Sequence, residues 1–190
     1  MEVYSPTKRT KILDVGVTCE DSHMESNFFE KLYPFKGQIT CVGTEDGSHL
    51  VKKYEGLKFQ IIKAGEMLPF KDREFDIVFS NAVVEHTGDV DGQRFFISEL
   101  CRVADKVFVS TPYRWFPMET HTCLPLLHFL PKNIFRGILR GSRYGFWAYE
   151  QNLNLLSMRD LLGIFPHEMD VKSKNIRLAG FISNIIAYTL

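Results

Sequence analysis

The sequence lacks an excess of charge of either sign. Its 23 lysine and arginine residues balance its 23 aspartate and glutamate residues, so the formal net charge is zero. Such a chain lacks the long-range attraction to phosphate backbones on which non-specific nucleic-acid binding depends. A nucleic-acid substrate is therefore disfavoured.

Paired cysteines are also missing. Cys19, Cys41, Cys101 and Cys123 are widely spaced and form no Cys-x-x-Cys pair. This spacing predicts neither a zinc site nor a disulfide framework, and single thiols are the simpler interpretation. We expect no metal site from this pattern.

Long apolar runs are absent as well. No stretch reaches the length that a membrane-spanning helix needs, and the N-terminus lacks the charged-then-apolar pattern of a secretory leader. We therefore expect a cytoplasmic protein. With 190 residues, 45% of them hydrophobic and 13% aromatic, the chain can bury one sizeable core. The simplest prediction is a single domain over residues 1–190.

Short β-rich runs alternate with helical patterns over most of the chain. A capping-box spacing at residues 22–25 predicts a first helix that ends before Pro34, and apolar spacing predicts others at 49–54, 91–103 and 157–164. The alternation favours right-handed crossovers and a parallel sheet. Two final β-rich runs, joined near residues 179–180, predict a closing hairpin. The predicted strands are 11–15, 38–42, 58–62, 75–79, 106–110, 168–176 and 181–189.

The stretch from Phe75 to His86 organises the rest. Residues 75–79 are apolar and rich in β-branched or aromatic side chains, which is typical of a strand buried on both faces. The run breaks at Ser80 and Asn81. Polar groups at the carboxyl end of such a strand mark where sheets of this kind bind ligands.

Four motifs give the chain a family resemblance. They are Lys-Ile-Leu-Asp14-Val-Gly16, Glu66-x-Leu-Pro-Phe70, Phe-Asp76-Ile-Val-Phe-Ser-Asn81-Ala-Val-Val-Glu85-His86 and Val-Phe-Val-Ser-Thr-Pro112. Together they resemble class I S-adenosylmethionine-dependent methyltransferases, more narrowly the small-molecule branch that includes quinone and sterol methyltransferases. The resemblance covers about residues 11–112. It implies a three-layer, Rossmann-like α/β fold with a mostly parallel seven-stranded sheet that ends in an antiparallel hairpin.

The resemblance also implies the activity and the cofactor. S-adenosylmethionine would supply an electrophilic methyl group to an oxygen, nitrogen or carbon atom of a small-molecule, glycan or lipid-linked acceptor. The protein would mainly orient the reactants and exclude water. A general base is needed only if the nucleophile loses a proton during attack.

The chain departs from the family pattern at the first turn. Relatives carry Asp-x-Gly-x-Gly-x-Gly there, whereas only Gly16 of these glycines is present. The usual acidic residue at the end of the second strand corresponds to Gly43, with Glu45 and Asp46 just beyond it. A non-catalytic binding or scaffolding module with this fold is the alternative. A dinucleotide oxidoreductase is less favoured, because Glu20 and Asp21 would repel a pyrophosphate.

The resemblance assigns cofactor contacts to residues at the strand ends. Asp14 is expected to anchor the amino-acid portion of the cofactor, and Glu45 and Asp46 the ribose hydroxyls. A turn-stabilising role for Asp14, and a solvated turn for the two acids, are the alternatives. The full set of candidates is Asp14, Gly16, Glu45, Asp46, Gly65, Glu66, Asn81 and Ala82.

Acceptor contacts are expected from an insertion at about residues 113–150. Its aromatic residues, histidines and prolines can form an apolar wall with a few polar points, which is how small-ligand sites are lined; a lid that only packs on the sheet is the alternative. Tyr113, Arg114 and Trp115 are candidate substrate contacts. Candidate bases are His86, His121, His128 and Glu119. For His86 a structural hydrogen bond is the preferred interpretation.

The basic and aromatic run at residues 132–147 has two interpretations. It can touch an anionic membrane surface or a lipid-linked substrate, or it can form a solvated helix face, which we favour. The sequence does not indicate an oligomeric state.

Overall fold

The computed structural model describes residues 3–20 and 26–190. The capping box predicted at residues 22–25 lies outside the described residues. The described chain forms two compact units. The first comprises the described residues up to Asn81, together with Glu99–Phe108 and Leu190. The second comprises Ala82–Ser98 and Val109–Thr189.

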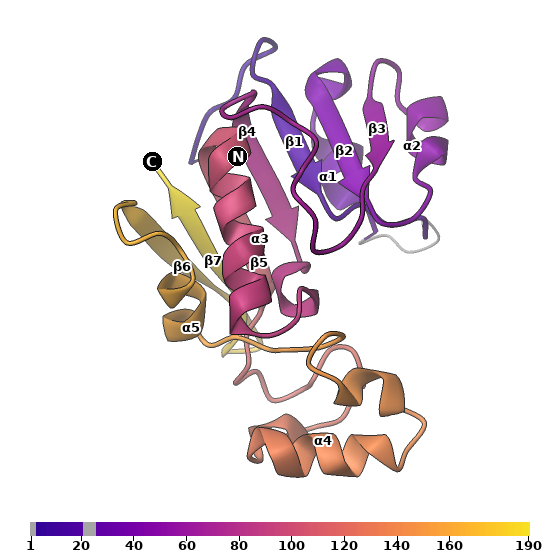
Figure 1. The fold of residues 1–190 in the computed structure, drawn as a ribbon, viewed down its shortest axis with the longest axis vertical. Helices are drawn as coiled ribbons and strands as arrows, with labels where there is room; N and C mark the ends of the chain where they lie inside the picture. Colours follow the sequence, from indigo (N-terminus) through magenta and orange to yellow (C-terminus); the bar gives the residue numbers. More distant parts are fainter. Residues whose placement is uncertain (1–2, 21–25) are drawn as a thin grey trace. The chain divides into compact units, whose positions relative to one another are not determined.

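Parallel strands form the sheet of the first unit. Strand β1 pairs with β2 on one side and β4 on the other, and β3 pairs with the outer edge of β2 (Figure 1). β1 is buried along its whole length, as expected for a short apolar strand in the middle of a sheet. The strands are β1 (Ile12–Val15), β2 (Ile39–Gly43), β3 (Lys58–Ile61), β4 (Phe75–Asn81) and the first part of β5 (Ala104–Pro112).

Aromatic rings fill the core of the first unit. Phe29 stacks on Phe79 of β4 with 4.6 Å between ring centres, and Phe79 stacks on Phe108 of β5 at 5.5 Å. Each such pair contributes about 0.5–1.5 kcal/mol beyond the burial of its area. Phe29 lies on α1 (Phe28–Leu32), which ends before Pro34 as predicted. The unit also contains η1 (Lys36–Gln38) and α2 (Ser48–Lys53).

The last turn of helix α3 (Val90–Val103) belongs to the first unit. There the Glu99 carboxylate accepts hydrogen bonds from the Leu68 backbone N–H at 2.8 Å and from the Arg102 guanidinium at 2.7 and 2.8 Å. Arg102 also donates to Asp72 at 2.9 Å and to the Leu68 carbonyl at 3.0 Å. This network ties the loop before β4 to α3.

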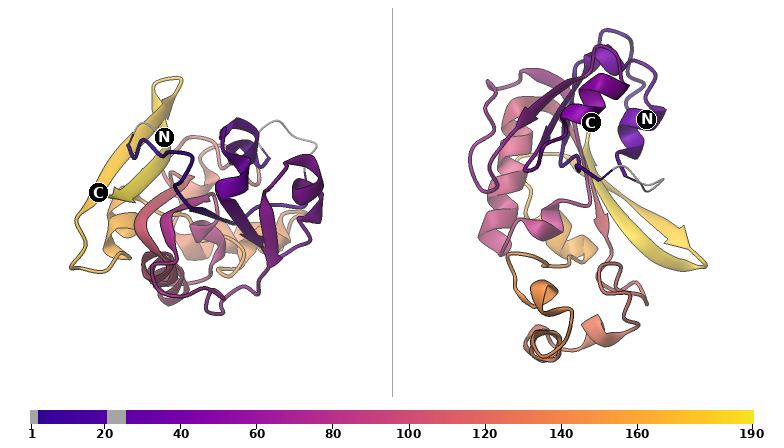
Figure 2. Two further views of the ribbon diagram at one scale, coloured as in Figure 1. Left: turned by 90° about the horizontal axis from the view of Figure 1, so that it is seen from above. Right: turned by 90° about the vertical axis from the view of Figure 1, so that its right-hand side faces the viewer.

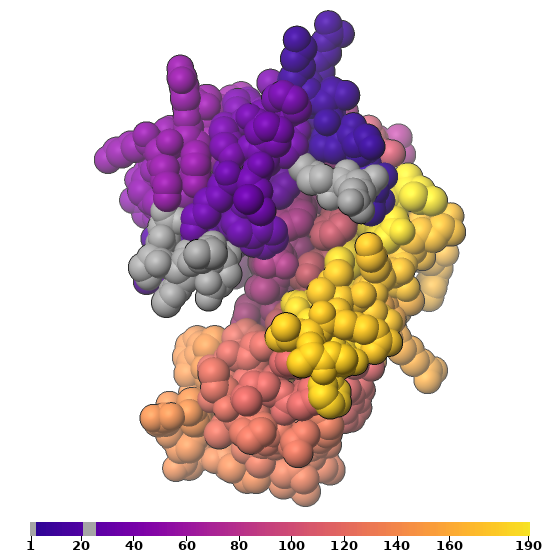
Figure 3. Space-filling model, turned by 180° about the vertical axis from the view of Figure 1, so that it is seen from behind, coloured from indigo at the N-terminus to yellow at the C-terminus, as the bar shows by residue number. Residues whose placement is uncertain are grey.

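An antiparallel hairpin and short helices make up the second unit. Strands β6 (Val171–Leu178) and β7 (Phe181–Thr189) run side by side in both views of Figure 2. Almost all of β6 is exposed, and the hairpin forms the yellow surface in Figure 3. Charged residues on β6 protect this edge against pairing with other chains. The helices are η2 (Val84–His86), η3 (Leu127–Phe129), α4 (Lys132–Arg140), η4 (Gly145–Ala148) and α5 (Met158–Gly163).

The strand order is β3-β2-β1-β4-β5-β7-β6. The mostly parallel seven-stranded sheet with a closing hairpin confirms the predicted Rossmann-like α/β fold. Two strands are longer than predicted, since β4 extends to Asn81 and β5 to Pro112. Within the described ranges, no helix combines the length and the apolar character needed to cross a membrane.

Replacement of Glu99 by glutamine tests the network around α3. Hydrogen bonds from Arg102 hold the pKa of Glu99 below its usual value, because they favour the ionised form. The ionised carboxylate therefore stabilises the fold above the unfolded pKa, and this stabilisation is lost as the pH falls through the lower folded pKa. We expect Glu99→Gln to lower the free energy of unfolding at neutral pH by about 1.5–3 kcal/mol.

Urea unfolding at neutral and acid pH measures this effect, and the difference between the two proteins should shrink in acid. Asp91→Asn is the matched control, because Asp91 forms an ion pair of the same spacing on the same helix with Arg94, but exposed and at 3.4 Å. Asp91→Asn should lower the free energy of unfolding by less than about 0.5 kcal/mol. Equal losses in both variants would contradict the role given to Glu99.

Candidate functional site

Backbone contacts and one asparagine hold the turn after β1. Gly16, at φ 106°, and Val17 both donate their N–H groups to the Val42 carbonyl, at 2.9 and 3.2 Å. The Asn27 side chain accepts from the Thr18 N–H and donates to the Thr18 carbonyl, both at 3.0 Å. These contacts fix the start of the turn without the later glycines of the family pattern.

Gly43 has a steric role at the end of β2. A Cβ atom at this position would lie 2.6 Å from the Val17 carbonyl oxygen, closer than real Cβ atoms approach other atoms. The turn after β1 thus packs directly on the backbone of β2. The family's acidic residue could not stand here without moving that turn.

Asp14 belongs to a buried pair of carboxyl groups. It is 5% exposed and lies close enough to Glu30 of α1, which is fully buried, for the two carboxyl groups to interact. Burial, and then the charge of Glu30, raise the pKa of Asp14 well above its usual value. The Cys41 thiol donates to Glu30 Oε1 at 3.2 Å, whereas Glu30 Oε2 has no hydrogen-bond partner among the described residues. A cationic group of a ligand would be stabilised beside this pair.

The carboxyl ends of β1, β2 and β4 meet at one edge of the sheet. The Ser80 hydroxyl of β4 donates to the Val15 carbonyl of β1 at 3.0 Å, and Asn81 follows it. Beyond β2, Glu45 accepts a hydrogen bond from Cys19 at 2.7 Å. The edge thus brings Asp14, Gly16, Glu45 and Asn81 together.

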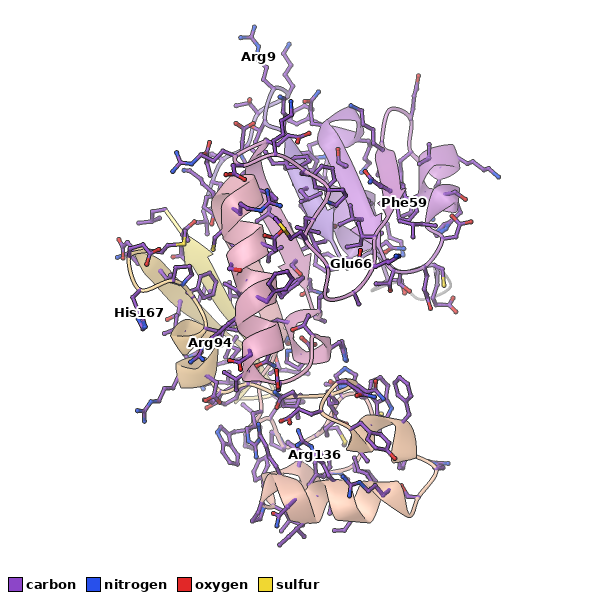
Figure 4. All side chains as sticks on the ribbon, viewed as in Figure 1. Arg9, Phe59, Glu66, Arg94, Arg136 and His167 are labelled. Atoms are coloured by element: carbon purple, nitrogen blue, oxygen red, sulfur yellow. The ribbon has the colours of Figure 1, made fainter. Side chains whose placement is uncertain are left out.

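Two further candidates are engaged in local contacts. Asp46 accepts from the Ser48 N–H at 2.9 Å, and this hydrogen bond lowers the pKa of Asp46. Glu66, labelled in Figure 4, lies in the loop after β3 and forms an exposed ion pair with Lys63 at 3.5 Å. Gly65 precedes it with φ 75°, a conformation that favours glycine.

A cavity of about 540 Å³ in the first unit lies at the opposite end of the strands, where its lining includes Lys11, Lys58 and Phe75. These residues precede or begin β1, β3 and β4. Parallel sheets of this kind bind ligands at the carboxyl ends of their strands. The cavity is therefore not the candidate site.

The second unit begins with a strained residue. Ala82 has φ 55°, and its N–H donates to the Ser110 carbonyl at 2.8 Å. Non-glycine residues in this conformation cost about 1–3 kcal/mol and cluster at functional sites. The strain directs the chain from β4 into η2.

Two histidines face each other in the second unit. The Nε2 atoms of His86 and His121 lie 3.1 Å apart, and Glu85 Oε1 lies 3.9 Å from His86 Nε2. Glu85 is fully buried, its Oε2 accepts from the Thr111 hydroxyl at 2.8 Å, and burial raises its pKa. Trp147 packs against both imidazoles, with ring centres 5.8 Å from His86 and 4.8 Å from His121.

The other ring nitrogens fix the tautomers of both histidines. His86 Nδ1 lies 2.6 Å from the Asn152 carbonyl, which can only accept, so this nitrogen carries the proton. His121 Nδ1 lies 2.7 Å from Glu119 Oε1. Although burial opposes it, hydrogen bonds from His121 and Thr122 lower the pKa of Glu119 to about 2, so the carboxylate accepts. Both Nε2 atoms therefore present lone pairs when the rings are neutral.

Asn154 holds this region in place. Its backbone N–H donates to the Glu85 carbonyl at 2.7 Å, and its side chain donates to the Gly88 carbonyl at 3.0 Å and accepts from Lys132 at 2.8 Å. Sequence reasoning missed Asn154, Glu85 and Trp147 as site residues. Only Glu85 had a signal, because it stands in a quoted motif beside His86.

The remaining predicted acceptor residues lie elsewhere in the second unit. His128 is 2% exposed, its Nε2 donates to the Phe116 carbonyl at 2.9 Å, and burial lowers its pKa. The Arg114 guanidinium lies over the Trp115 ring at 5.1 Å. Tyr113 donates its backbone N–H to the Ser183 carbonyl at 2.9 Å. Only His86, His121 and Glu119 of the predicted bases thus form one cluster.

Residues 26–106 match the family model described as a methyltransferase domain. A search of the curated proteins finds no match. Solved structures with a similar fold include YcgJ from Bacillus subtilis, at 19% identity and a TM-score of 0.61 over 93% of this chain and 68% of that one. The N-methyltransferase NodS from Bradyrhizobium japonicum, in complex with S-adenosylhomocysteine, has 12% identity and a TM-score of 0.59 over 95% and 76%. The SAM-dependent methyltransferase TM1293 from Thermotoga maritima has 14% identity and a TM-score of 0.58 over 99% and 84%.

Residues 26–106 thus match a methyltransferase domain, and the described fold is similar to that of solved S-adenosylmethionine-dependent methyltransferases. The cofactor that the motifs and this similarity imply is S-adenosylmethionine. The described residues fit this molecule, because the Asp14 and Glu30 pair suits the cofactor's ammonium group and the unpartnered Glu30 Oε2 leaves an acceptor for it.

Addition of one methyl group at Gly43 tests the packing of the first turn. We expect Gly43→Ala to lower the free energy of unfolding by about 1–3 kcal/mol, because the Val17 carbonyl must move. Gly137→Ala on α4 is the control, since a Cβ there meets nothing within 4 Å and should stabilise the protein by about 0.4–1 kcal/mol. Urea unfolding measures both. A Gly43→Ala protein as stable as the wild type would contradict the steric role.

Proposed function

We propose that the protein transfers a methyl group from S-adenosylmethionine to a nucleophilic atom of a small-molecule, glycan or lipid-linked acceptor. The arrangement of Glu119, His121 and His86 carries this proposal, since Glu119 accepts from His121 Nδ1 at 2.7 Å and His121 Nε2 faces His86 Nε2 at 3.1 Å. A carboxylate that orients a histidine, whose other nitrogen is a free acceptor, is the arrangement by which enzymes activate a nucleophile. This activation is needed when the attacking atom of the acceptor is an oxygen or nitrogen that must lose its proton.

The cofactor, when bound, supplies an electrophilic methyl group and leaves as S-adenosylhomocysteine. The chain's own residues then have separate tasks. In the first unit, Asp14 and Glu30 would hold the cofactor's ammonium group, and Gly16 and Asn81 lie at the same sheet edge. In the second unit, the facing Nε2 atoms of His86 and His121 can take up positive charge as the acceptor loses its proton.

The segment at residues 113–131 would supply the acceptor contacts. Trp147 adds an apolar wall beside the two histidines. On α4, Ile134 and Ile138 lie one turn apart and are 48% and 47% exposed, a face that suits the hydrocarbon part of a lipid-linked acceptor. By contrast, Arg136, labelled in Figure 4, is paired with Glu150 at 3.0 Å. This pairing favours contact through apolar side chains over attraction to an anionic membrane.

Asp14→Asn tests the cofactor assignment. Because the folded protein raises the pKa of Asp14, stability from this group is full below the unfolded pKa and is lost as the pH rises toward the folded value. Asparagine resembles the protonated acid, so the variant should be at least as stable as the wild type at neutral pH. Its affinity for S-adenosylhomocysteine should fall about tenfold or more, since hydrogen bonds to charged groups contribute about 1.5–3 kcal/mol.

Isothermal titration with S-adenosylhomocysteine and urea unfolding measure the two effects. Asp170→Asn, at an exposed ion pair with Lys172 in the second unit, is the control for loss of a carboxylate and should change neither quantity much. Unchanged affinity in a folded Asp14→Asn protein would remove Asp14 from the cofactor site.

His121→Asn tests the activating role, because the asparagine amide can still donate to Glu119 while the free acceptor nitrogen is lost. With an acceptor found by screening sugars, phenols and lipid-linked sugars for release of S-adenosylhomocysteine, turnover should fall about 10²–10⁴-fold. Cofactor affinity should stay unchanged. His128→Asn, at a histidine already bonded to Phe116, should retain more activity than His121→Asn.

The activity of His121→Asn and the acceptor screen also separate the competing functions. Full activity in His121→Asn would place the activating group elsewhere. Cofactor binding without release of S-adenosylhomocysteine on any acceptor would favour the non-catalytic module, for which the single glycine of the first turn is the supporting observation.

A further inference from the structure

We infer that Glu85, His86 and His121 form a binding site for one divalent transition-metal ion. Each residue offers one ligand atom, and the three atoms lie within 4.8 Å of one another. All three residues lie in the second unit. The site itself is argued from these contacts, whereas its part in catalysis rests on the proposed function.

The first argument is the electrostatics of the two rings. Both Nδ1 atoms donate, to the Asn152 carbonyl and to the Glu119 carboxylate. The two Nε2 lone pairs then face each other at 3.1 Å, which is repulsive unless a positive charge lies between them. A metal ion supplies that charge.

The second argument is the direction of the lone pairs. In a tetrahedral site with metal–nitrogen distances of about 2.0–2.1 Å, two ligand nitrogens lie about 3.3 Å apart, close to the 3.1 Å seen here. At the observed 3.1 Å the same metal–nitrogen distances require an N–metal–N angle of about 98°, and if both lone pairs point at the ion, the ring centres should be about 4.9 Å apart. The observed separation of the ring centres is 4.8 Å. A straight N–H···N hydrogen bond at the same N···N distance would put the ring centres farther apart, at about 5.4 Å.

The third argument is the unused oxygen of Glu85. Glu85 Oε1 is buried, has no hydrogen-bond partner among the described residues and lies 3.9 Å from His86 Nε2. A buried carboxylate oxygen without a partner is costly, and coordination of a cation removes that cost. A proton shared by the two histidines would leave this oxygen unpaired.

The surroundings of the three ligands have the form that metal sites require. Metal-binding histidines almost always donate their second ring nitrogen to a carboxylate or a backbone carbonyl, and ligating carboxylates are themselves hydrogen-bonded. Here Glu119 and the Asn152 carbonyl orient the histidines, and the Thr111 hydroxyl orients Glu85. The Thr122 N–H and hydroxyl in turn hold Glu119, at 2.7 and 2.6 Å.

Two imidazoles and one carboxylate favour zinc and its transition-metal neighbours over magnesium or calcium, which prefer oxygen ligands. Three protein ligands leave a coordination position free for a further molecule. We assign this position to a hydroxyl group of the acceptor, which a metal ion orients and makes more acidic. With the ion bound, both Nε2 lone pairs are coordinated, so the ion replaces the histidines as the activating group: the proton of that hydroxyl passes to solvent, and the oxygen then attacks the methyl group of the cofactor, which leaves as S-adenosylhomocysteine.

The test measures metal binding to the full-length protein without cofactor or acceptor. After removal of bound metal with a chelator, Co²⁺ is added and followed by visible absorption, and Zn²⁺ by isothermal titration. We expect one ion per chain, with d–d bands of a nitrogen and oxygen ligand set. Thiolate charge-transfer bands would instead report binding by Cys19 or Cys123, which are exposed, and would overturn the inference.

Four variants locate the site. His86→Asn and His121→Asn remove one ligand each but keep the donor to Asn152 or Glu119, and Glu85→Gln keeps the acceptor for Thr111; each should weaken Co²⁺ binding at least tenfold. Glu119→Gln changes only the orienting group and should weaken it about 10–100-fold. His167→Ala is the control, because His167 is exposed and follows α5 (Figure 4), and its affinity should equal that of the wild type.

Each outcome decides the inference. Absence of stoichiometric binding, or equal affinity in the wild type and the three ligand variants, would overturn it and leave a shared proton as the positive charge between the histidines. Circular dichroism identifies a variant that does not fold, and Glu119→Gln then serves in its place. Since no methyl transfer is measured, failure of the proposed function does not alter this result. If methyl transfer continued at full rate after metal removal, the catalytic role of the ion would be overturned, but the metal-binding site would not.

Discussion

The second unit depends on the need of every buried polar group for a partner. Glu85 is fully buried, and its two ends are met by different segments, since Asn154 donates to its carbonyl and Thr111 to its carboxylate. Asn154 in turn is 2% exposed and accepts from Gln93 and Lys132. Because each of these bonds is costly to leave unmade, together they fix the turn that carries His86.

A different constraint shapes the first unit. The family's glycines allow backbone to approach a ligand closely, whereas here the close approach is between the turn after β1 and the backbone of β2, at Gly43. The same close contact between the turn after β1 and the backbone of β2 thus accounts for both the missing glycines and the missing acidic residue. With no acid at the end of β2, the acidic groups that the described residues place at this edge include the buried pair Asp14 and Glu30 and the exposed Glu45.

The sequence predicted the fold well because periodicity and strand-end polarity are local signals, as for β1 and β4. It predicted the seven-stranded sheet and its hairpin, and it named His86, His121 and Glu119 without showing that they meet. Their contact depends on the path of the chain from β5 to η4, which has no regular period to read. The roles of Glu30 and Asn154 were not predictable, since they follow from burial alone. One domain with an insertion at 113–150 stays a prediction.

The expectation of no metal site rested on cysteine spacing, and that signal does not report on histidines far apart in the sequence. Glu85 and His86 are neighbours on η2, which precedes β5 in the sequence, whereas His121 follows β5. A proton and a metal ion can occupy the same two lone pairs, and Glu119 would favour the binding of either by fixing the tautomer and orientation of His121. Glu85 distinguishes them. Two imidazoles can share a proton without a third group, whereas an ion with further coordination positions also satisfies the buried Glu85 Oε1.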